Sequence, residues 1–142
     1  MNAQTVMNQY KTVGLKSGVD SASPHQLIDM LLKGAMGKIS EAKAAMAGGQ
    51  IALKGEAVGK AIAIVEYLRV SLDPGIDAAF SEQLGELYRY IETRLLAANL
   101  KNDTEALDEA QALLRELSAG WAGALCLLRG ARVSFRPACN GG

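Results

Sequence analysis

The sequence contains little of what metal-binding, secreted or membrane-spanning proteins need. Its 142 residues include two cysteines, Cys126 and Cys139, one histidine, His25, and only 5% aromatic residues. A structural zinc site needs about four converging Cys or His ligands, so we expect free thiols and no metal site. No apolar run is long enough to cross a bilayer, and residues 1–22 lack the pattern of a secretory signal. These absences favour a cytosolic protein.

A charge imbalance is also absent. Lys plus Arg and Asp plus Glu each total 15, the formal net charge is zero, and no block of like charge occurs. Nucleic-acid binders carry a clustered cationic surface, so we exclude that class. The sequence also lacks a nucleophile with a base, a di-iron ligand pattern and a glycine loop that follows a strand. The protein is therefore predicted to be no enzyme and to need no cofactor.

What is present is a strong helical pattern, clearest over residues 23–46. Ser23 is suited to cap the start of this helix, Pro24 to occupy its first position, and Gly48 with Gly49 to stop it. Apolar side chains recur in steps of four and three, which places one narrow stripe on one face of the helix. This stripe consists of Ile28, Leu32, Ala35, Ile39, Ala42 and Met46.

Three further helices are predicted, over residues 51–72, 77–99 and from 102 or 103 to about 128. Asp73-Pro74-Gly75 ends the second, Asn99 is the expected left-handed terminator of the third, and the fourth should weaken after Trp121. The third helix is expected to bury Phe80, Leu84, Leu87, Ile91, Leu95 and Ala98.

The short links between these helices require antiparallel neighbours. The predicted fold is all-α, an antiparallel up-down four-helix bundle with a short N-terminal helical segment inside residues 1–22. Residues 1–125 are expected to form a single domain. Residues 126–142 are expected to form an atypical C-terminal tail, disordered beyond about residue 130, because proline and glycine replace the helical period there.

The helix over residues 51–72 has a second apolar face, which includes Leu53, Ala57, Ile64 and Tyr67. A helix with two apolar faces either lies at the centre of a larger core or presents a surface to a partner. The residues alone leave both open. They indicate a helical interaction module, and one alternative is a generic adaptor or homodimeric scaffold that uses this face.

Several strings, taken in order, resemble the FliS family of flagellar secretion chaperones. They are Tyr10, Ala22-Ser23-Pro24-His25-Gln26-Leu27-Ile28, Met30-Leu31, Ser71-Leu72-Asp73, Leu87-Tyr88-Arg89-Tyr90, Ala98-Asn99, Leu113-Leu114 and Trp121. The resemblance covers residues 1–125 and stops at Cys126, after which the sequence departs from the family pattern.

The resemblance implies a bacterial cytosolic chaperone that binds the disordered C-terminal segment of flagellin. Such a chaperone prevents premature polymerisation and delivers flagellin to the type III export gate of the flagellum. Flagellar regulatory proteins and a homodimer are possible further partners.

The resemblance also matches Tyr10 to the N-terminal tyrosine of the family. We hypothesise that Val6 and Tyr10 form a displaceable cover, and that Leu53, Ala57, Ile64, Tyr67 and Tyr88 line the flagellin groove. The groove residues are chosen from the helix faces. If they are surface residues, Asp at Ile64 or Tyr67 should abolish binding and leave thermal stability nearly unchanged.

Overall fold

Four long helices make up the part of the chain that the structure describes. This structure is a computed structural model that describes residues 24–72, 75 and 77–130, with the backbone alone for residues 24 and 122–130. The helices are α2 (Pro24–Ala47), α3 (Ile51–Val70), α4 (Ala78–Lys101) and α5 (Thr104–Gly130), and no strand occurs among these residues. The all-α prediction is confirmed. The predicted N-terminal helical segment lies outside the described residues.

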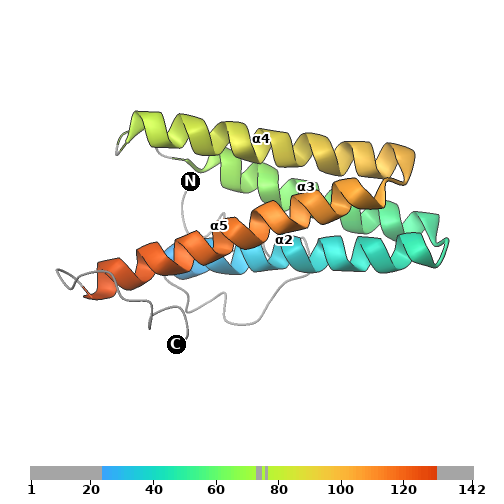
Figure 1. Cartoon of the computed structure of the whole chain (residues 1–142), viewed down its shortest axis with the longest axis horizontal. Helices are drawn as coiled ribbons and strands as arrows, with labels where there is room; N and C mark the ends of the chain where they lie inside the picture. The colour runs from blue at the N-terminus through green and yellow to red at the C-terminus, as the bar shows by residue number, and fades with distance from the viewer. Residues whose placement is uncertain (1–23, 73–74, 76, 131–142) are drawn as a thin grey trace.

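The helices form an antiparallel bundle in which each contacts two neighbours. α3 packs between α2 and α4, and α5 packs against both α4 and α2, which closes the arrangement (Figure 1). The links at 48–50 and 102–103 are too short to reach anything but an adjacent antiparallel helix. The predicted four-helix bundle is therefore confirmed.

The core is built from small and branched apolar side chains at the three-four spacing that the sequence predicts. Each helix contributes side chains with no exposed surface, and each such side chain is stabilised by removal from water. Fully buried positions include Leu31 and Ile39 of α2, Val58 and Val65 of α3, Ile91 and Leu95 of α4, and Leu107 and Leu114 of α5.

The helix ends agree with the prediction at two positions. α2 stops at Ala47, and Gly49 follows with a φ of +69°, a conformation that glycine adopts without steric cost. α4 starts after Asp77, whose carboxylate accepts a hydrogen bond from the backbone N–H of Phe80 at 3.0 Å. Such a cap satisfies one of the free N–H groups of the first turn.

One expectation about α4 is wrong. α4 continues past Asn99 to Lys101, and Asn102 is the residue with left-handed backbone, at φ 52° and ψ 46°. α5 runs to Gly130, close to the predicted end at about residue 128. Residues 131–142, where we predict disorder, lie outside the described residues.

A polar contact fixes the register of α2 against α5. The side chain of Gln111 is nearly buried, and its Nε2 donates to the carbonyl oxygen of Met36 at 3.0 Å and to Oγ of Ser40 at 2.8 Å. Beside it, Nζ of Lys43 lies 2.6 Å from the carboxylate of Asp108. These contacts exist at only one axial position of α5 relative to α2.

Candidate binding surfaces

The structure separates the predicted groove residues into buried and exposed ones. Ile64, Tyr67 and Tyr88 are 0%, 5% and 4% exposed, and Ala57 is 5% exposed, whereas Leu53 is 52% exposed. The expectation that Ile64, Tyr67 and Tyr88 lie open on the surface is wrong. α3 is covered by α2 on one side and by α4 on the other, so its second apolar face is mostly used within the bundle. Val6 and Tyr10 lie outside the described residues.

One end of the bundle contains an apolar hollow, which we call the end cavity. Its volume is about 280 Å³, and all four helices contribute to its wall. Phe80, which we expected in the core, lies in the first turn of α4 and is 58% exposed at the edge of the cavity. The lining residues are Ile28, Leu68, Ser71, Leu72, Asp77, Phe80, Ser81, Leu84, Tyr88 and Trp121.

Trp121 connects two walls of the end cavity. Its Nε1 donates a 2.8 Å hydrogen bond to the carbonyl oxygen of His25, and the two rings lie 5.3 Å apart and tilted by 34°. Because Trp121 is the only tryptophan in the chain, it is also an intrinsic optical probe of this cavity.

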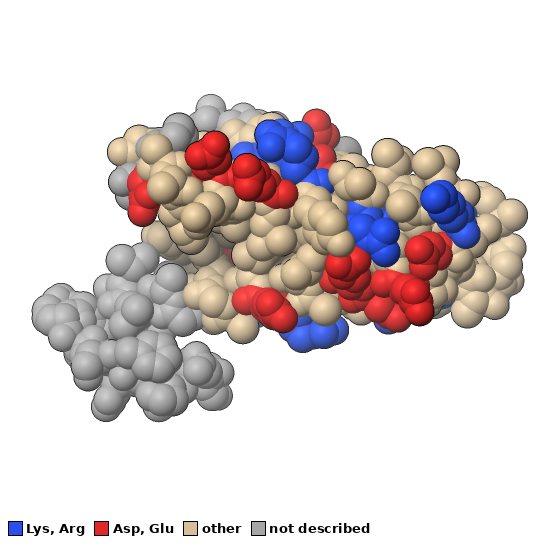
Figure 2. Space-filling model, turned by 45° about the horizontal axis from the view of Figure 1, so that its top comes forward, with Lys and Arg blue, Asp and Glu red and all other residues tan. Residues whose placement is uncertain are grey.

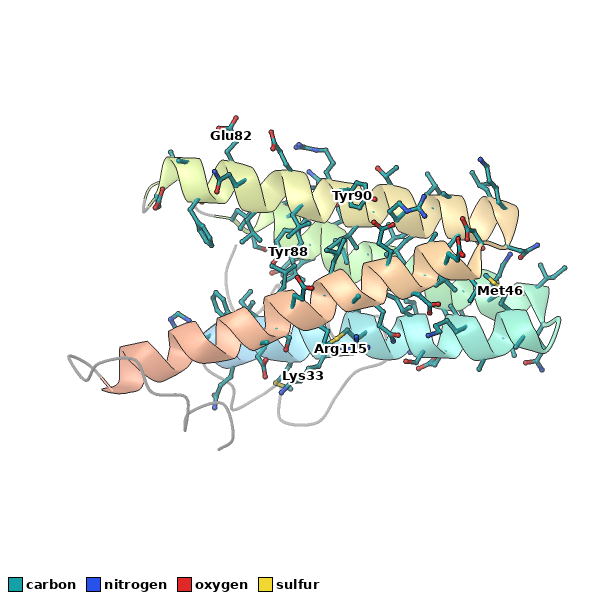
Figure 3. All side chains as sticks on the ribbon, viewed as in Figure 1. Lys33, Met46, Glu82, Tyr88, Tyr90 and Arg115 are labelled. Carbon is teal, nitrogen blue, oxygen red and sulfur yellow. The ribbon has the colours of Figure 1, made fainter. Side chains whose placement is uncertain are left out.

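Tyr88 forms the inner wall of the end cavity. Figure 3 shows its side chain directed into the bundle, while Glu82 on the same helix points away. Burial raises the pKa of Tyr88 to about 12. Burial also raises the pKa of Tyr67, and Ser71 partly offsets that rise.

A second hollow, which we call the side hollow, lies between α2 and α3. Its volume is about 290 Å³, and Leu53 and Ala57 are the predicted site residues that line it. Its other lining residues are Glu41, Ala44, Ala45, Gln50, Glu56 and Lys60, so charged and amide groups form much of its wall.

The two hollows do not form one pocket. Leu53 lines the side hollow and Leu68 lines the end cavity. At a rise of 1.5 Å per residue, these two positions on α3 are about 22 Å apart. Tyr88 therefore belongs to a different surface from Leu53 and Ala57, and the predicted site is divided between them.

At the opposite end of the bundle, a buried lysine that the sequence analysis missed connects α3 to the end of α4, beside a hollow of about 380 Å³ that this lysine also lines. Lys54 is only 5% exposed, and its Nζ donates to the carbonyl oxygen of Asn99 at 3.0 Å and to Oδ1 of Asn102 at 2.6 Å. A cation at a helix C-terminus is favoured by the helix dipole and by the unpaired carbonyls. Position 54 continues the three-four spacing of the apolar side chains of α3. A lysine at such a position could have indicated a buried cation.

Charges of both signs occur on the face of the molecule drawn in Figure 2. Figure 2 shows acidic and basic side chains interspersed over one face, with large neutral areas between them. No group of three or more His, Cys, Asp or Glu side chains within the described residues could hold a metal ion. Among these residues, no helix combines the length and apolarity needed to cross a membrane.

The described part of the chain buries three polar side chains. They are Lys54, Gln111 and Ser118. Lys54 and Gln111 hydrogen-bond to neighbouring helices, and Oγ of Ser118 lies 3.4 Å from the carboxylate of Asp29. Buried polar groups require such partners, so these three tie helices together.

Comparison with known proteins identifies the family. A sequence profile described as "Flagellar protein FliS" matches residues 6–126. The flagellar secretion chaperone FliSB of Pseudomonas aeruginosa is 42% identical over 123 residues, which are 87% of this chain and 98% of that protein.

Relatives from other bacteria are also similar to this chain. The flagellar secretion chaperone FliS of Salmonella typhimurium is 42% identical over 113 residues, which are 79% of this chain and 84% of that protein. The FliS of Bacillus subtilis is 31% identical over 116 residues, or 82% of this chain and 85% of that protein. These matches confirm the resemblance and the prediction that the protein is no enzyme. The chain belongs to the FliS family of flagellar secretion chaperones.

Proposed function

We propose that this protein binds the disordered C-terminal segment of flagellin in the bacterial cytosol. Bound there, it prevents premature polymerisation of flagellin and delivers it to the flagellar type III export apparatus. The observation that carries the proposal is the end cavity, an apolar hollow with a half-exposed phenylalanine on a member of a flagellar chaperone family. Exposed apolar surface of this kind is typical of a binding site.

The division of the surface suggests how a client would bind. A segment that contacts both the end cavity and the side hollow must span about 22 Å, which is about 15 helical residues. A disordered segment that orders on binding can cover separated surfaces in this way. We place Leu53 and Ala57 at one contact and Phe80 and Tyr88 at the other, with Ile64 and Tyr67 supporting them from the core.

A direct test uses Trp121 as the reporter. A tryptophan-free peptide from the C-terminus of flagellin is titrated into the protein, and binding is followed by Trp121 emission and by calorimetry. We expect saturable binding with a negative heat-capacity change, because apolar surface is buried. Absence of binding at high peptide concentration contradicts the proposal.

Two matched variants locate the site. Phe80 and Leu100 are both exposed on α4, by 58% and 73%, and lie at opposite ends of the helix. Phe80→Asp is expected to weaken peptide binding by about tenfold or more, which corresponds to about 1.4 kcal/mol, because it places a charge at the apolar edge. Leu100→Asp should have little effect. Equal losses contradict the location at the end cavity.

The alternative is a generic adaptor or homodimeric scaffold without flagellin specificity. The exposed Leu96 and Leu100, both on α4, could support such self-association. Analytical ultracentrifugation distinguishes the two. A tight dimer that does not bind the flagellin peptide supports the scaffold, and a peptide-binding monomer supports the chaperone. Delivery to the export apparatus is tested by pull-down of the protein with the export gate and with flagellar regulatory proteins, each in the presence and absence of flagellin.

A further inference from the structure

The end cavity has a single acidic group at its edge. Asp77 is the one charged residue that lines it, and the rest of the wall is apolar or aromatic except for two serines. The side hollow differs, because Glu41, Glu56 and Lys60 give its wall charges of both signs. The end cavity therefore combines apolar surface with one negative charge.

The Asp77 carboxylate is only partly used within the protein. Its Oδ1 accepts the backbone N–H of Phe80 at 3.0 Å, and it forms no ion pair among the described residues. The positive end of α4 offsets only about half a charge. Between Arg69 and Arg89 the sequence has four acidic residues and no lysine or arginine, and Arg69 itself pairs with Glu92 at 2.8 Å. The edge of the cavity thus keeps a negative charge that a bound cation can neutralise.

The spacing of the edge residues matches one turn of a helix. Asp77 and Phe80 lie three positions apart at the start of α4, and both line the cavity. A helical partner carries side chains three or four positions apart on one face, with about 5–6 Å between their Cβ atoms. Such a partner can place an apolar side chain against Phe80 and a cation against Asp77 at the same time.

The size of the end cavity suits an inserted side chain. Its volume is about 280 Å³. Pockets that hold whole small molecules are typically larger, at roughly 300–1,000 Å³. One or two side chains of a polypeptide are therefore a better match than a small-molecule ligand.

We propose that the end cavity selects partner segments that carry a large apolar residue with Lys or Arg three or four positions away. The apolar side chain enters the cavity, and the cation pairs with the Asp77 carboxylate. Removal of the apolar side chain from water supplies most of the binding free energy, whereas the ion pair discriminates among partners. The identity of the client rests on the proposed function, but the chemistry of this contact is tested separately.

The first test neutralises the two members of the ion pair in turn. Each arginine or lysine of the flagellin C-terminal peptide is replaced by citrulline or acetyl-lysine, and each peptide is titrated into the wild-type protein and Asp77→Asn, with Trp121 emission as the readout. Asn caps a helix as well as Asp, so this variant loses the charge and keeps the start of α4. We expect one replacement to weaken binding to the wild type by about fivefold and to have no further effect in Asp77→Asn.

The control is Glu82→Gln, because Glu82 lies on the same helix and points away from the bundle (Figure 3). It should change binding by less than about twofold, since salt screens a distant surface charge. Circular dichroism checks the folding of each variant, and Asp77→Ser provides a second neutral cap. Equal binding of every peptide to the wild type, Asp77→Asn and Asp77→Ser overturns the inference and leaves the proposed function intact.

The second test does not use flagellin. A random peptide library displayed on phage is depleted on Phe80→Ser and then selected on the wild-type protein and, separately, on Asp77→Asn. We expect the wild type to enrich peptides with Leu, Ile or Phe and a Lys or Arg three or four positions away, and Asp77→Asn to enrich the apolar residue alone. The same enrichment on both proteins, or no enrichment after the depletion, overturns the inference whether or not the flagellin peptide binds.

Discussion

The two ends of the bundle differ in the side chains that cover them. At one end, Lys54 connects the start of α3 to the last turn of α4 and to Asn102, so polar groups pair with one another. At the other, Phe80 and Leu84 line a hollow that the helices leave unfilled. Both ends contain a hollow, but Lys54 and Asn102 line the one at the first end, whereas the wall of the end cavity is mostly apolar and is better suited to bind an apolar partner. We call the end fastened by Lys54 the closed end and the end with the apolar hollow the open end.

The largest effect is expected in the core that both ends share. Ile64→Ala should lower the free energy of unfolding by about 2–5 kcal/mol, because a fully buried side chain is replaced by a cavity. The matched control is Leu53→Ala, at a side chain that is 52% exposed. Urea denaturation of both variants measures the difference. Similar losses would contradict the burial of Ile64.

The open end should lose stability at high pH. Tyr88 is neutral in the folded state up to its pKa of about 12, whereas in the unfolded chain it ionises near 10. The unfolded state therefore binds fewer protons between these values, and stability falls by about 2–3 kcal/mol as pH rises through this window. Tyr67, whose pKa burial also raises, adds to the fall.

The urea midpoint measured at several pH values between 9 and 12 tests this prediction. Tyr88→Phe should make the decline shallower without removing it, since Tyr67 remains. An unchanged slope in Tyr88→Phe would show that Tyr88 does not cause the decline.

The free energy of unfolding should depend on the contacts that Lys54 makes at the closed end. Lys54→Met should cost about 1.5–3 kcal/mol, because it leaves the carbonyl of Asn99 and the amide of Asn102 without their charged partner. Lys60→Met is the control, since Lys60 makes only a surface ion pair with Glu56 at 3.8 Å and should cost below about 0.5 kcal/mol.

Hydrogen exchange locates the loss. The last-turn amides of α4 should exchange faster in Lys54→Met, and those of its first turn should not. A uniform increase along α4 would show that the effect is global and not confined to the closed end.

The smallest effect is expected at Phe80. Phe80→Ser should change the free energy of unfolding by less than about 0.5 kcal/mol, since the side chain is already 58% exposed. Leu95→Ala on the same helix should cost about 2–5 kcal/mol, because Leu95 is fully buried. A large loss in Phe80→Ser would mean that Phe80 is a structural residue and not part of an open surface.

The helices could be predicted because their signals are local. The stripe from Ile28 to Met46 and the stop at Gly48 and Gly49 need no knowledge of the rest of the fold, and α2 has these features. The end of α4 could not be predicted in the same way. Asn99 and Asn102 are both suitable terminators. In the structure α4 ends at Asn102, where Lys54 of α3 donates a hydrogen bond to the carbonyl oxygen of Asn99, and the sequence of α4 alone does not show this contact.

The binding surface was predictable only in part, because periodicity shows that a side chain is apolar but not which neighbour covers it. The second face of α3 was correctly identified as apolar, yet Ile64 and Tyr67 are covered within the bundle. Phe80 fits the core period of α4, yet it lies in the first turn of the helix and is 58% exposed. Such differences depend on relative helix length and position, which emerge only in three dimensions.

The contact of Gln111 with α2 restricts how the protein can move. Sliding α5 by one turn, about 5.4 Å, would strand the amide of Gln111 away from Met36 and Ser40 in an apolar environment. Tilting α5 about this contact would separate Trp121 from His25 and keep the amide paired. The Gln111 contact therefore opposes sliding of α5 along its axis more strongly than it opposes tilting of α5 at the Trp121 end.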